Sequence, residues 1–218
     1  ETDFKHITKH DYWYSKENLI KLKYLSSVID SMEFAATKSF FNLALAETIR
    51  DVSFTRNGEF KRYRIEANKI PTYNPNPFVL IADKIKRNLD GLNNFLKDAS
   101  EFTVNISDCN SVYEIPHSLL AKESVDMVVT SPPYGDSRTT VAYGQFSRWA
   151  GEWFRFPNAK NIDRTLMGGM PKKIDSIDTV ALATELEQIK QSDIKRYYEV
   201  TTFLDEYSRS IENVAGVI

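Results

Sequence analysis

Residues 125–134 read VDMVVTSPPY, and this stretch decides which fold the sequence predicts. The run from Val125 to Val129 is apolar except for Asp126, which is typical of a strand buried inside a parallel sheet. A polar turn follows, beginning at Thr130. Ligand sites of open α/β sheets form beside the carboxyl ends of the strands. The turn is therefore predicted to lie at a binding site.

The rest of the chain is predicted to combine helices with one further strand. Apolar side chains recur every three or four positions over residues 16–32, 34–52, 78–99, 143–154, 179–190 and 193–214, as in amphipathic helices. Residues 102–106 alternate like a strand and lead to Asp108. We expect an α/β fold, with a mainly helical portion over residues 1–100. A Rossmann-like sheet, incomplete in this chain, is expected over residues 101–218, in one continuous domain or in two.

Composition favours a folded protein in a reducing compartment. The chain has 218 residues, of which 42% are hydrophobic and 27% charged. It contains no apolar run near the roughly 20 residues that a membrane span requires, and no secretory signal is visible. The lone Cys109 gives no disulfide framework. The expected location is cytoplasmic.

The chain starts at Glu1 rather than Met and ends at Ile218 without an obvious stop, so we expect it to be part of something longer.

Two segments are basic although the formal net charge is −2. Residues 55–76 and residues 155–176 each hold five basic and two acidic side chains. Such segments are typical of solvated loops, and they are also what a phosphate-binding surface requires. The candidate DNA contacts in them are Arg62, Arg64, Lys172 and Lys173.

The turn after Val129 has the groups needed to hold a planar amine. An exocyclic amine of cytosine or adenine is a poor nucleophile, because its lone pair is delocalised into the ring. Acceptors aimed at its N–H groups redirect that lone pair, and the Ser131 hydroxyl and Pro132 carbonyl are suitable. Pro132 and Pro133 make the turn stiff. Tyr134 can stack on a base, a contact worth about 1–3 kcal/mol, once the base has left the duplex.

The string TSPPY at residues 130–134 resembles motif IV of the amino-DNA methyltransferases, which use S-adenosylmethionine. Residues 130–148, and more weakly residues 14–19, are similar to one branch of the site-specific bacterial enzymes of restriction–modification systems. The resemblance implies that Ser131 and Pro132 bind the target amine and that Tyr134 stacks on the base. It also implies double-stranded DNA as the substrate. A leading Ser is commoner among enzymes that modify cytosine N4, with adenine N6 as the alternative target.

The resemblance also implies a methyl-donor site, for which this sequence is incomplete. In the family an acidic residue near Asp108 contacts the adenosine of the donor, although Asp108 is equally suited to capping a turn. We assign Thr130 to the donor site as well. The Gly-rich donor turn of the family is missing from this sequence. The chain is then a fragment, one subunit of a split enzyme whose partner supplies the donor loop, or a relative that only binds DNA.

Other chemistry-bearing residues receive lesser roles. Cys109 follows a carboxylate, which opposes thiolate formation, so we predict a packing role for it rather than a nucleophilic one. His6, His10 and His117 lack partners at metal-ligand spacing, and no metal site is predicted. Arg138 either contacts DNA or pairs with Asp136. RNA or a protein glutamine is a rival substrate, although related glutamine enzymes typically carry Asn at the position of Ser131.

Overall fold

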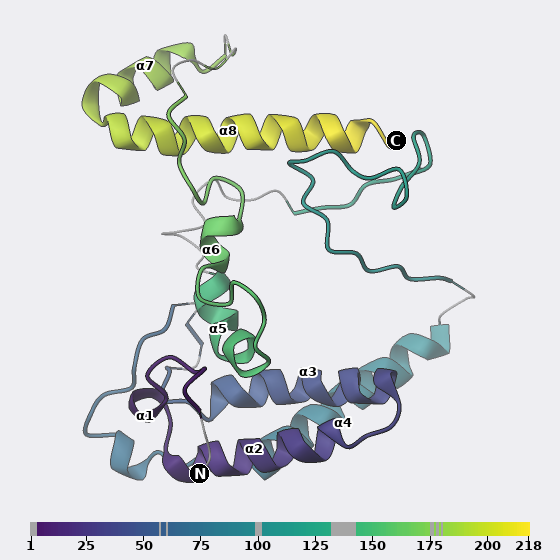
Figure 1. Cartoon of the computed structure of the whole chain (residues 1–218), viewed down its shortest axis with the longest axis vertical. Helices are drawn as coiled ribbons and strands as arrows, with labels where there is room; N and C mark the ends of the chain where they lie inside the picture. The colour runs from purple at the N-terminus through teal and green to yellow at the C-terminus, as the bar shows by residue number, and fades with distance from the viewer. Residues whose placement is uncertain are drawn as a thin grey trace. The chain divides into compact units, whose positions relative to one another are not determined.

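The computed structural model describes residues 4–56, 58–59, 61–98, 102–131, 143–174, 177, 179 and 181–218. Within these residues the chain forms helices joined by irregular segments (Figure 1). The helices are α1 (His10–Trp13), α2 (Lys16–Asp30), α3 (Ala35–Asp51), the 3-10 helix η1 (Ile70–Thr72), α4 (Pro77–Asp98), α5 (Tyr143–Trp153), α6 (Ile162–Thr165), α7 (Ala183–Ser192) and α8 (Ile194–Ala215).

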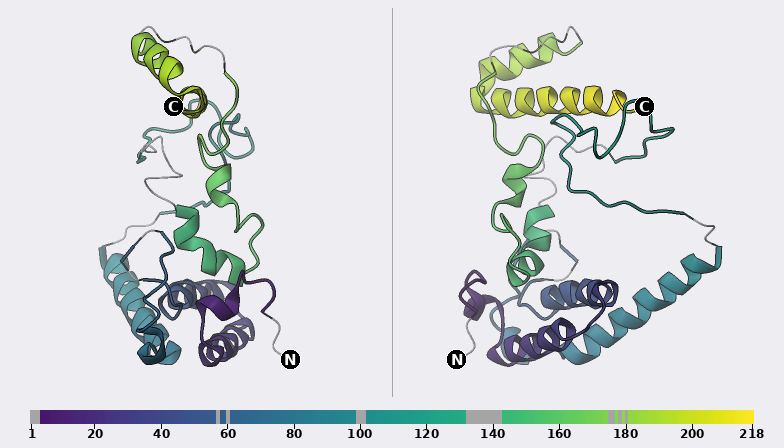
Figure 2. Two further views of the ribbon diagram at one scale, coloured as in Figure 1. Left: turned by 90° about the vertical axis from the view of Figure 1, so that its left-hand side faces the viewer. Right: turned by 45° about the vertical axis from the view of Figure 1, so that its right-hand side comes forward.

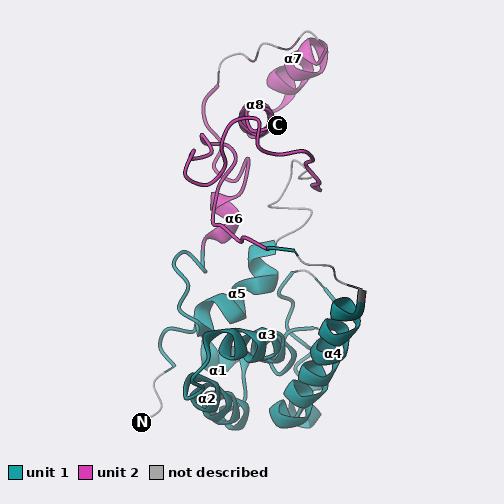
Figure 3. Ribbon diagram, turned by 90° about the vertical axis from the view of Figure 1, so that its right-hand side faces the viewer, with its two compact units in different colours: residues 1–103, 143–160 teal, residues 104–142, 161–218 magenta. Residues whose placement is uncertain are grey.

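The chain divides into two compact units, which Figure 3 colours separately. Unit 1 comprises residues 1–103 and 143–160, and unit 2 comprises residues 104–142 and 161–218. The chain therefore leaves unit 1 after α4 and returns to it for α5. The functional division at residue 100, between a helical and a catalytic portion, stays a prediction.

Unit 1 is a helical bundle centred on α3, which packs against α2, α4 and α5 (Figure 1). Helix α2 begins at Lys16 because the Ser15 hydroxyl accepts a hydrogen bond of 3.1 Å from the Asn18 N–H, an N-cap. Leu22 of α2 and Leu45 of α3 are fully buried in the shared core. Helical spacing thus brings the apolar faces of α2 and α3 together.

Helix α5 adds the largest fully buried side chain of that core, Trp149. The indole is fully buried, and its Nε1–H donates to the Thr55 hydroxyl at 3.0 Å. Thr55 also forms an isolated antiparallel bridge with Arg64. Trp153 belongs to the same cluster, so both tryptophans of α5 are core residues.

Unit 2 is built on a helical hairpin in which α7 folds back against α8 (Figure 2). Helix α8 begins after Asp193, whose carboxylate accepts from the backbone N–H groups of Lys195 and Arg196, each at 3.0 Å. The irregular residues 104–131 are fastened to the carboxyl half of this helix. Hydrogen bonds join Ser111 to Ser210 and to Asn213, and the backbone N–H groups of Ser124 and Val125 to the Val217 carbonyl.

The predicted Rossmann-like α/β fold is wrong for this chain. The described residues contain no sheet, and their one β-bridge joins Thr55 to Arg64. Strands are predicted at residues 102–106 and 125–129, the second of them buried, yet Ile106 is 94% and Val129 87% exposed. A strand forms only where a neighbour accepts its backbone hydrogen bonds and covers its side chains. The described chain supplies no such neighbour to either segment.

The helix predictions are confirmed, with boundaries that differ by a few residues. Residues 16–32, 34–52, 78–99, 143–154, 179–190 and 193–214 correspond to α2, α3, α4, α5, α7 and α8. The packing role predicted for Cys109 is wrong, because Cys109 is exposed. Among the helices described, none is long and apolar enough to cross a membrane.

Candidate functional site

The first half of the Ser131 turn lies on the surface of unit 2. Thr130 and Ser131 are both exposed, so the Ser131 hydroxyl is accessible to a ligand. Pro132, Pro133, Tyr134 and Arg138 lie outside the described residues. Their roles in holding an amine, stacking on a base and contacting DNA stay predictions.

The predicted donor residues do not form a cradle in the described part of the chain. Asp108 and Thr130 are both exposed, and no hydrogen bond joins them there. The one pair of adjacent glycines in the sequence, Gly168-Gly169, serves a different purpose, because it lets a loop approach α8 closely. Gly168 has φ +70° and donates its N–H to Glu206 Oε2 at 2.7 Å. The described residues therefore do not fit the methionine end of S-adenosylmethionine.

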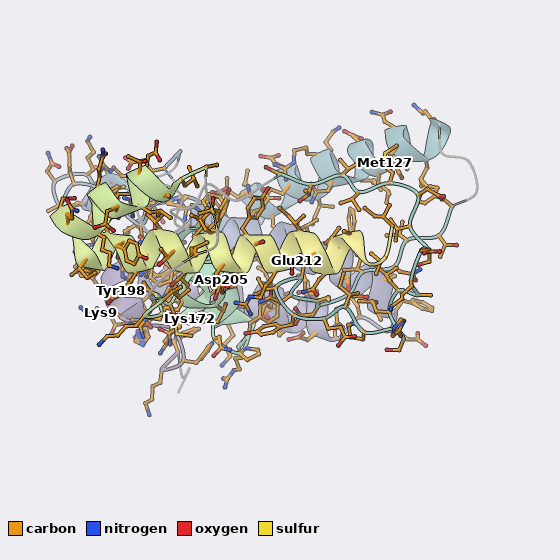
Figure 4. The ribbon with its side chains drawn as sticks, turned by 90° about the horizontal axis from the view of Figure 1, so that it is seen from above. Lys9, Met127, Lys172, Tyr198, Asp205 and Glu212 are labelled. Atoms are coloured by element: carbon orange, nitrogen blue, oxygen red, sulfur yellow. The ribbon has the colours of Figure 1, made fainter. Side chains whose placement is uncertain are left out.

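The same loop holds Lys172, one of the predicted DNA contacts. Its Nζ lies 2.9 Å from Glu206 Oε1, and its backbone N–H donates to the Thr202 hydroxyl at 2.7 Å. Figure 4 shows Lys172 beside the middle of α8, near the labelled Asp205. Lys173 is exposed. Lys172 thus serves to dock the loop on α8, and the contact of both lysines with DNA stays a prediction.

Arg62 and Arg64 are stacked on aromatic rings of unit 1. The Arg62 Cζ lies 4.8 Å from the ring centroid of Trp149 and 5.9 Å from that of Trp13. The Arg64 Cζ lies 4.0 Å from the Tyr12 ring, and its Nε donates to the Tyr12 carbonyl at 3.0 Å. Cation–π contacts of this kind are worth about 0.5–2 kcal/mol. The two guanidinium groups therefore help hold the loop after α3 in place, and a role in DNA binding stays a prediction.

Sequence reasoning missed a buried carboxylate on α5, that of Glu152. Its oxygens accept hydrogen bonds from the Thr8 backbone N–H, from the Thr8 hydroxyl at 2.9 Å and from Arg148 Nε at 2.6 Å. Burial alone would raise the pKa of Glu152, but the hydrogen bonds from Thr8 and Arg148 outweigh it and lower that pKa. The spacing of Arg148 and Glu152, four positions apart on a predicted helix, was the available signal.

Arg50 was also missed, and it fastens the first turn of α5 to α3. Its guanidinium donates to the carbonyls of Phe146, at 3.1 Å, and of Glu59, and it lies 4.0 Å from the Phe146 ring. Burial lowers the pKa of Arg50 from its ordinary value. Gln145 adds a contact, since its side-chain oxygen accepts from the Arg62 N–H at 3.3 Å. Helix α5, which begins at Tyr143 shortly after the Ser-Pro-Pro-Tyr string, is therefore rigidly held within unit 1.

The sequence comparison identifies a relative with a named activity. The chain is 32% identical over 232 residues to the Type II methyltransferase M.MvaI of Kocuria varians. That relative is a methyltransferase. The match covers 99% of this chain but 50% of the relative, so the chain spans about half the relative's length. No family model and no solved structure matches the chain.

The methyltransferase relative and the resemblance of the TSPPY string agree on the kind of protein that this chain is similar to. The similarity covers nearly the whole chain, including both units and the Ser131 turn. The described residues add an accessible Ser131 and a firmly packed α5 that follows the turn in sequence. No group of three or more His, Cys, Asp or Glu side chains suited to a metal ion occurs among the described residues.

Proposed function

We propose that the protein is a site-specific DNA methyltransferase, or a part of one, that methylates an exocyclic base amine with S-adenosylmethionine as the donor. The observation that carries the proposal is the string TSPPY at residues 130–134, within a chain similar over 99% of its length to a Type II methyltransferase. The surface position of Thr130 and Ser131 supports it, because a flipped base needs open access to the acceptor groups.

In this proposal the chain's residues orient the amine and hold the base. The Ser131 hydroxyl and the Pro132 carbonyl accept the two amine hydrogens, which aims the nitrogen lone pair at the methyl group. Tyr134 stacks on the ring. Transfer to nitrogen would be direct, without a covalent enzyme–base intermediate. The nitrogen–methyl bond would form as the donor's sulfur–methyl bond breaks, leaving a neutral thioether, and the methylated amine would release one proton to water. Cytosine N4 is the target that a leading Ser favours, with adenine N6 as the alternative.

Substitution of Ser131 tests the proposal. Ser131→Ala removes one of the two amine acceptors, and losses of about 100-fold are typical when a single aligning hydrogen bond is removed from an active site. The assay measures transfer of labelled methyl groups from S-adenosylmethionine to duplex DNA, with DNA affinity measured in parallel. Ser118→Ala is the matched control, since Ser118 is an exposed serine of the same unit. An unchanged rate for Ser131→Ala contradicts the assigned role.

Nucleoside analysis of the methylated DNA separates the two target bases. Digestion and mass spectrometry distinguish N4-methylcytosine from N6-methyladenine. Recovery of the adenine product overturns the preference for cytosine and leaves the amine-methylation proposal standing.

The missing Gly-rich turn favours a second candidate, a DNA-recognition subunit without donor binding of its own. In that case a second chain or a further segment supplies the donor loop. Calorimetry discriminates the two. Heat released on mixing the protein with S-adenosylmethionine supports the complete enzyme, whereas salt-sensitive DNA binding without any such heat supports the recognition subunit.

A further inference from the structure

Unit 1 contains a groove whose lining combines basic, hydroxyl and aromatic side chains. Its volume is about 420 Å³, within the range of small-ligand pockets. One wall is α2, with Lys23, Ser26 and Asp30. Another is the carboxyl end of α5 and the residues just after it. The two helices belong to the same unit (Figure 3).

The α2 wall is a polar stripe produced by helical spacing. Residues 23, 26, 27 and 30 recur at the three- and four-residue intervals that place side chains on one face. The apolar residues Leu19, Leu22 and Ile29 occupy the adjoining face and are buried in the core. Lys23 is exposed, and in the described part of the chain no ion pair engages its ammonium group. The stripe thus presents one cation, two hydroxyls and the Asp30 carboxylate to the groove. The Ser27 hydroxyl donates to the Tyr24 carbonyl at 2.7 Å, so it can only accept from a ligand.

The opposite wall carries Arg155 in a backbone conformation that arginine rarely adopts. Helix α5 ends with hydrogen bonds from the Arg155 N–H to the Glu152 carbonyl and from the Phe156 N–H to the Gly151 carbonyl, at 3.2 and 2.8 Å. This is the pattern of a left-handed helix end, and the left-handed residue is usually glycine. Arg155 takes that position with φ +56°. Strain of this kind persists only where the surrounding structure imposes it, and it is commoner at functional sites than elsewhere. Lys9, Glu123 and Asn158 also have a positive φ in the described part of the chain.

The groove chemistry suits a phosphodiester flanked by sugar or base. Lys23 and Arg155 supply two positive charges, and Ser26 supplies a neutral donor. Trp153 lines the aromatic part of the wall. Asp30 is the opposing charge, but it lies seven residues after Lys23, which is about 10 Å along the helix. Phosphate oxygens near Lys23 are therefore separated from the carboxylate by about one Debye length at ordinary salt.

We propose that this groove binds the phosphate backbone of DNA through Lys23 and Arg155. The proposal rests on the proposed function in taking DNA as the ligand. It adds Lys23 and Arg155 to the five basic side chains that sequence reasoning selected, which are Arg62, Arg64, Arg138, Lys172 and Lys173. Arg62 and Arg64 are stacked on rings and Lys172 is paired with Glu206, whereas Lys23 faces an open groove. Backbone contacts position a protein on the duplex without reading its sequence.

The first test compares charge removal inside and outside the groove. Lys23→Gln and Arg155→Gln each remove one groove cation, and Lys16→Gln removes one exposed cation from the same helix outside it. Fluorescence anisotropy with a labelled duplex is measured over a range of salt concentrations. Each groove variant should bind several-fold more weakly and lower the salt slope by about 0.9. Lys16→Gln should bind within about twofold of the parent protein. Equal losses in all three variants overturn the proposal.

The second test uses the strained helix end. Arg155→Gly relieves the left-handed backbone, so it should raise the melting temperature while weakening DNA binding as much as Arg155→Gln does. A glycine variant that melts lower assigns Arg155 a structural role and overturns the proposal. So does a variant that binds DNA normally.

Methyl transfer by Ser131→Ala, measured in parallel, keeps the two proposals distinguishable. If the groove variants bind DNA normally and Ser131→Ala loses methyl transfer, only the groove proposal is overturned. Weakened binding in the groove variants, with transfer unchanged in Ser131→Ala, overturns the Ser131 site alone.

Discussion

Two apolar parts of this chain lie in opposite environments, one buried in a core and the other exposed to solvent. In unit 1, Leu22 and Leu45 of α2 and α3 are fully buried, whereas in unit 2 Met127 and Val129 are 76% and 87% exposed. A helix satisfies its backbone groups within its own segment, so its apolar face needs only another apolar face. An extended segment needs a neighbouring strand as well. Apolar composition therefore predicts burial only where the backbone N–H and C=O groups of the segment already have hydrogen-bond partners.

The largest expected effect tests this contrast directly. Trp149→Ala empties the centre of unit 1 and removes the hydrogen bond to Thr55, so we expect a loss of about 4 kcal/mol in unfolding free energy. Met127→Ala removes an exposed side chain and should change stability by less than about 0.5 kcal/mol. Urea denaturation followed by circular dichroism measures both. A loss at Met127 comparable to that at Trp149 would show that residues 125–129 are covered in solution.

The same contrast explains which parts of the structure were predictable from sequence. Helix α2 was predictable because Ser15 caps it and its apolar residues follow helical spacing, both of which are local signals. The failed strands depended on pairing partners that no local pattern specifies. The candidate site residue Ser131 was selected from a short motif, and its role stays a prediction. Glu152 was missed because its burial depends on Thr8, far away in the sequence.

Glu152 provides the second prediction, a pH dependence located in unit 1. Glu152→Gln should lower the unfolding free energy by about 2–3 kcal/mol near pH 7, because it weakens charged hydrogen bonds to Thr8 and Arg148. The pKa of Glu152 is lowered in the fold from its ordinary value of 4.5. Its stabilising contribution is therefore complete above that ordinary pKa and is lost as the pH falls through the lower, folded pKa.

The measurement is a series of urea titrations from about pH 7 down to about pH 3. The difference between parent and Glu152→Gln should shrink toward the acid end, since the parent carboxyl becomes protonated there. Glu33→Gln, at an exposed position of unit 1, is the control and should run parallel to the parent. A constant difference at every pH rules out the charged form of Glu152 as the stabilising species.

The third prediction asks how firmly the loop before Lys172 is docked in unit 2. A Cβ at Gly169 would lie 2.5 Å from the Asp163 carbonyl oxygen and 2.7 Å from that of Arg164, both backbone atoms. Gly169→Ala should therefore destabilise unit 2 by about 1–3 kcal/mol. Gly91→Ala is a control of opposite sign, because nothing lies within 4 Å of a Cβ in the middle of α4. Alanine there should stabilise the helix by up to about 1 kcal/mol.

Hydrogen exchange localises the Gly169 effect. Faster exchange in residues 161–172 and in α8 is the expected result for Gly169→Ala. Exchange that is unchanged in both places means that the loop accommodates a methyl group, and that its contact with α8 is looser than the hydrogen bonds of Gly168 and Lys172 imply.

The smallest predicted effects concern the helix N-caps, one in each unit. Ser15 accepts one backbone N–H at the start of α2, whereas Asp193 accepts two at the start of α8 and adds a negative charge there. Replacement by alanine should cost about 1 kcal/mol at either position, with the larger loss at Asp193 because of the helix dipole. Asp193→Asn keeps an acceptor without the charge, so its unfolding free energy should fall between those of the parent and of Asp193→Ala.

Hydrogen exchange tests whether the two units unfold independently. If each unit is stable on its own, amide exchange should become faster in α2 alone for Ser15→Ala and in α8 alone for Asp193→Ala. Faster exchange in both units from a single cap would show that they unfold together, and the contrast between them would then describe one cooperative structure.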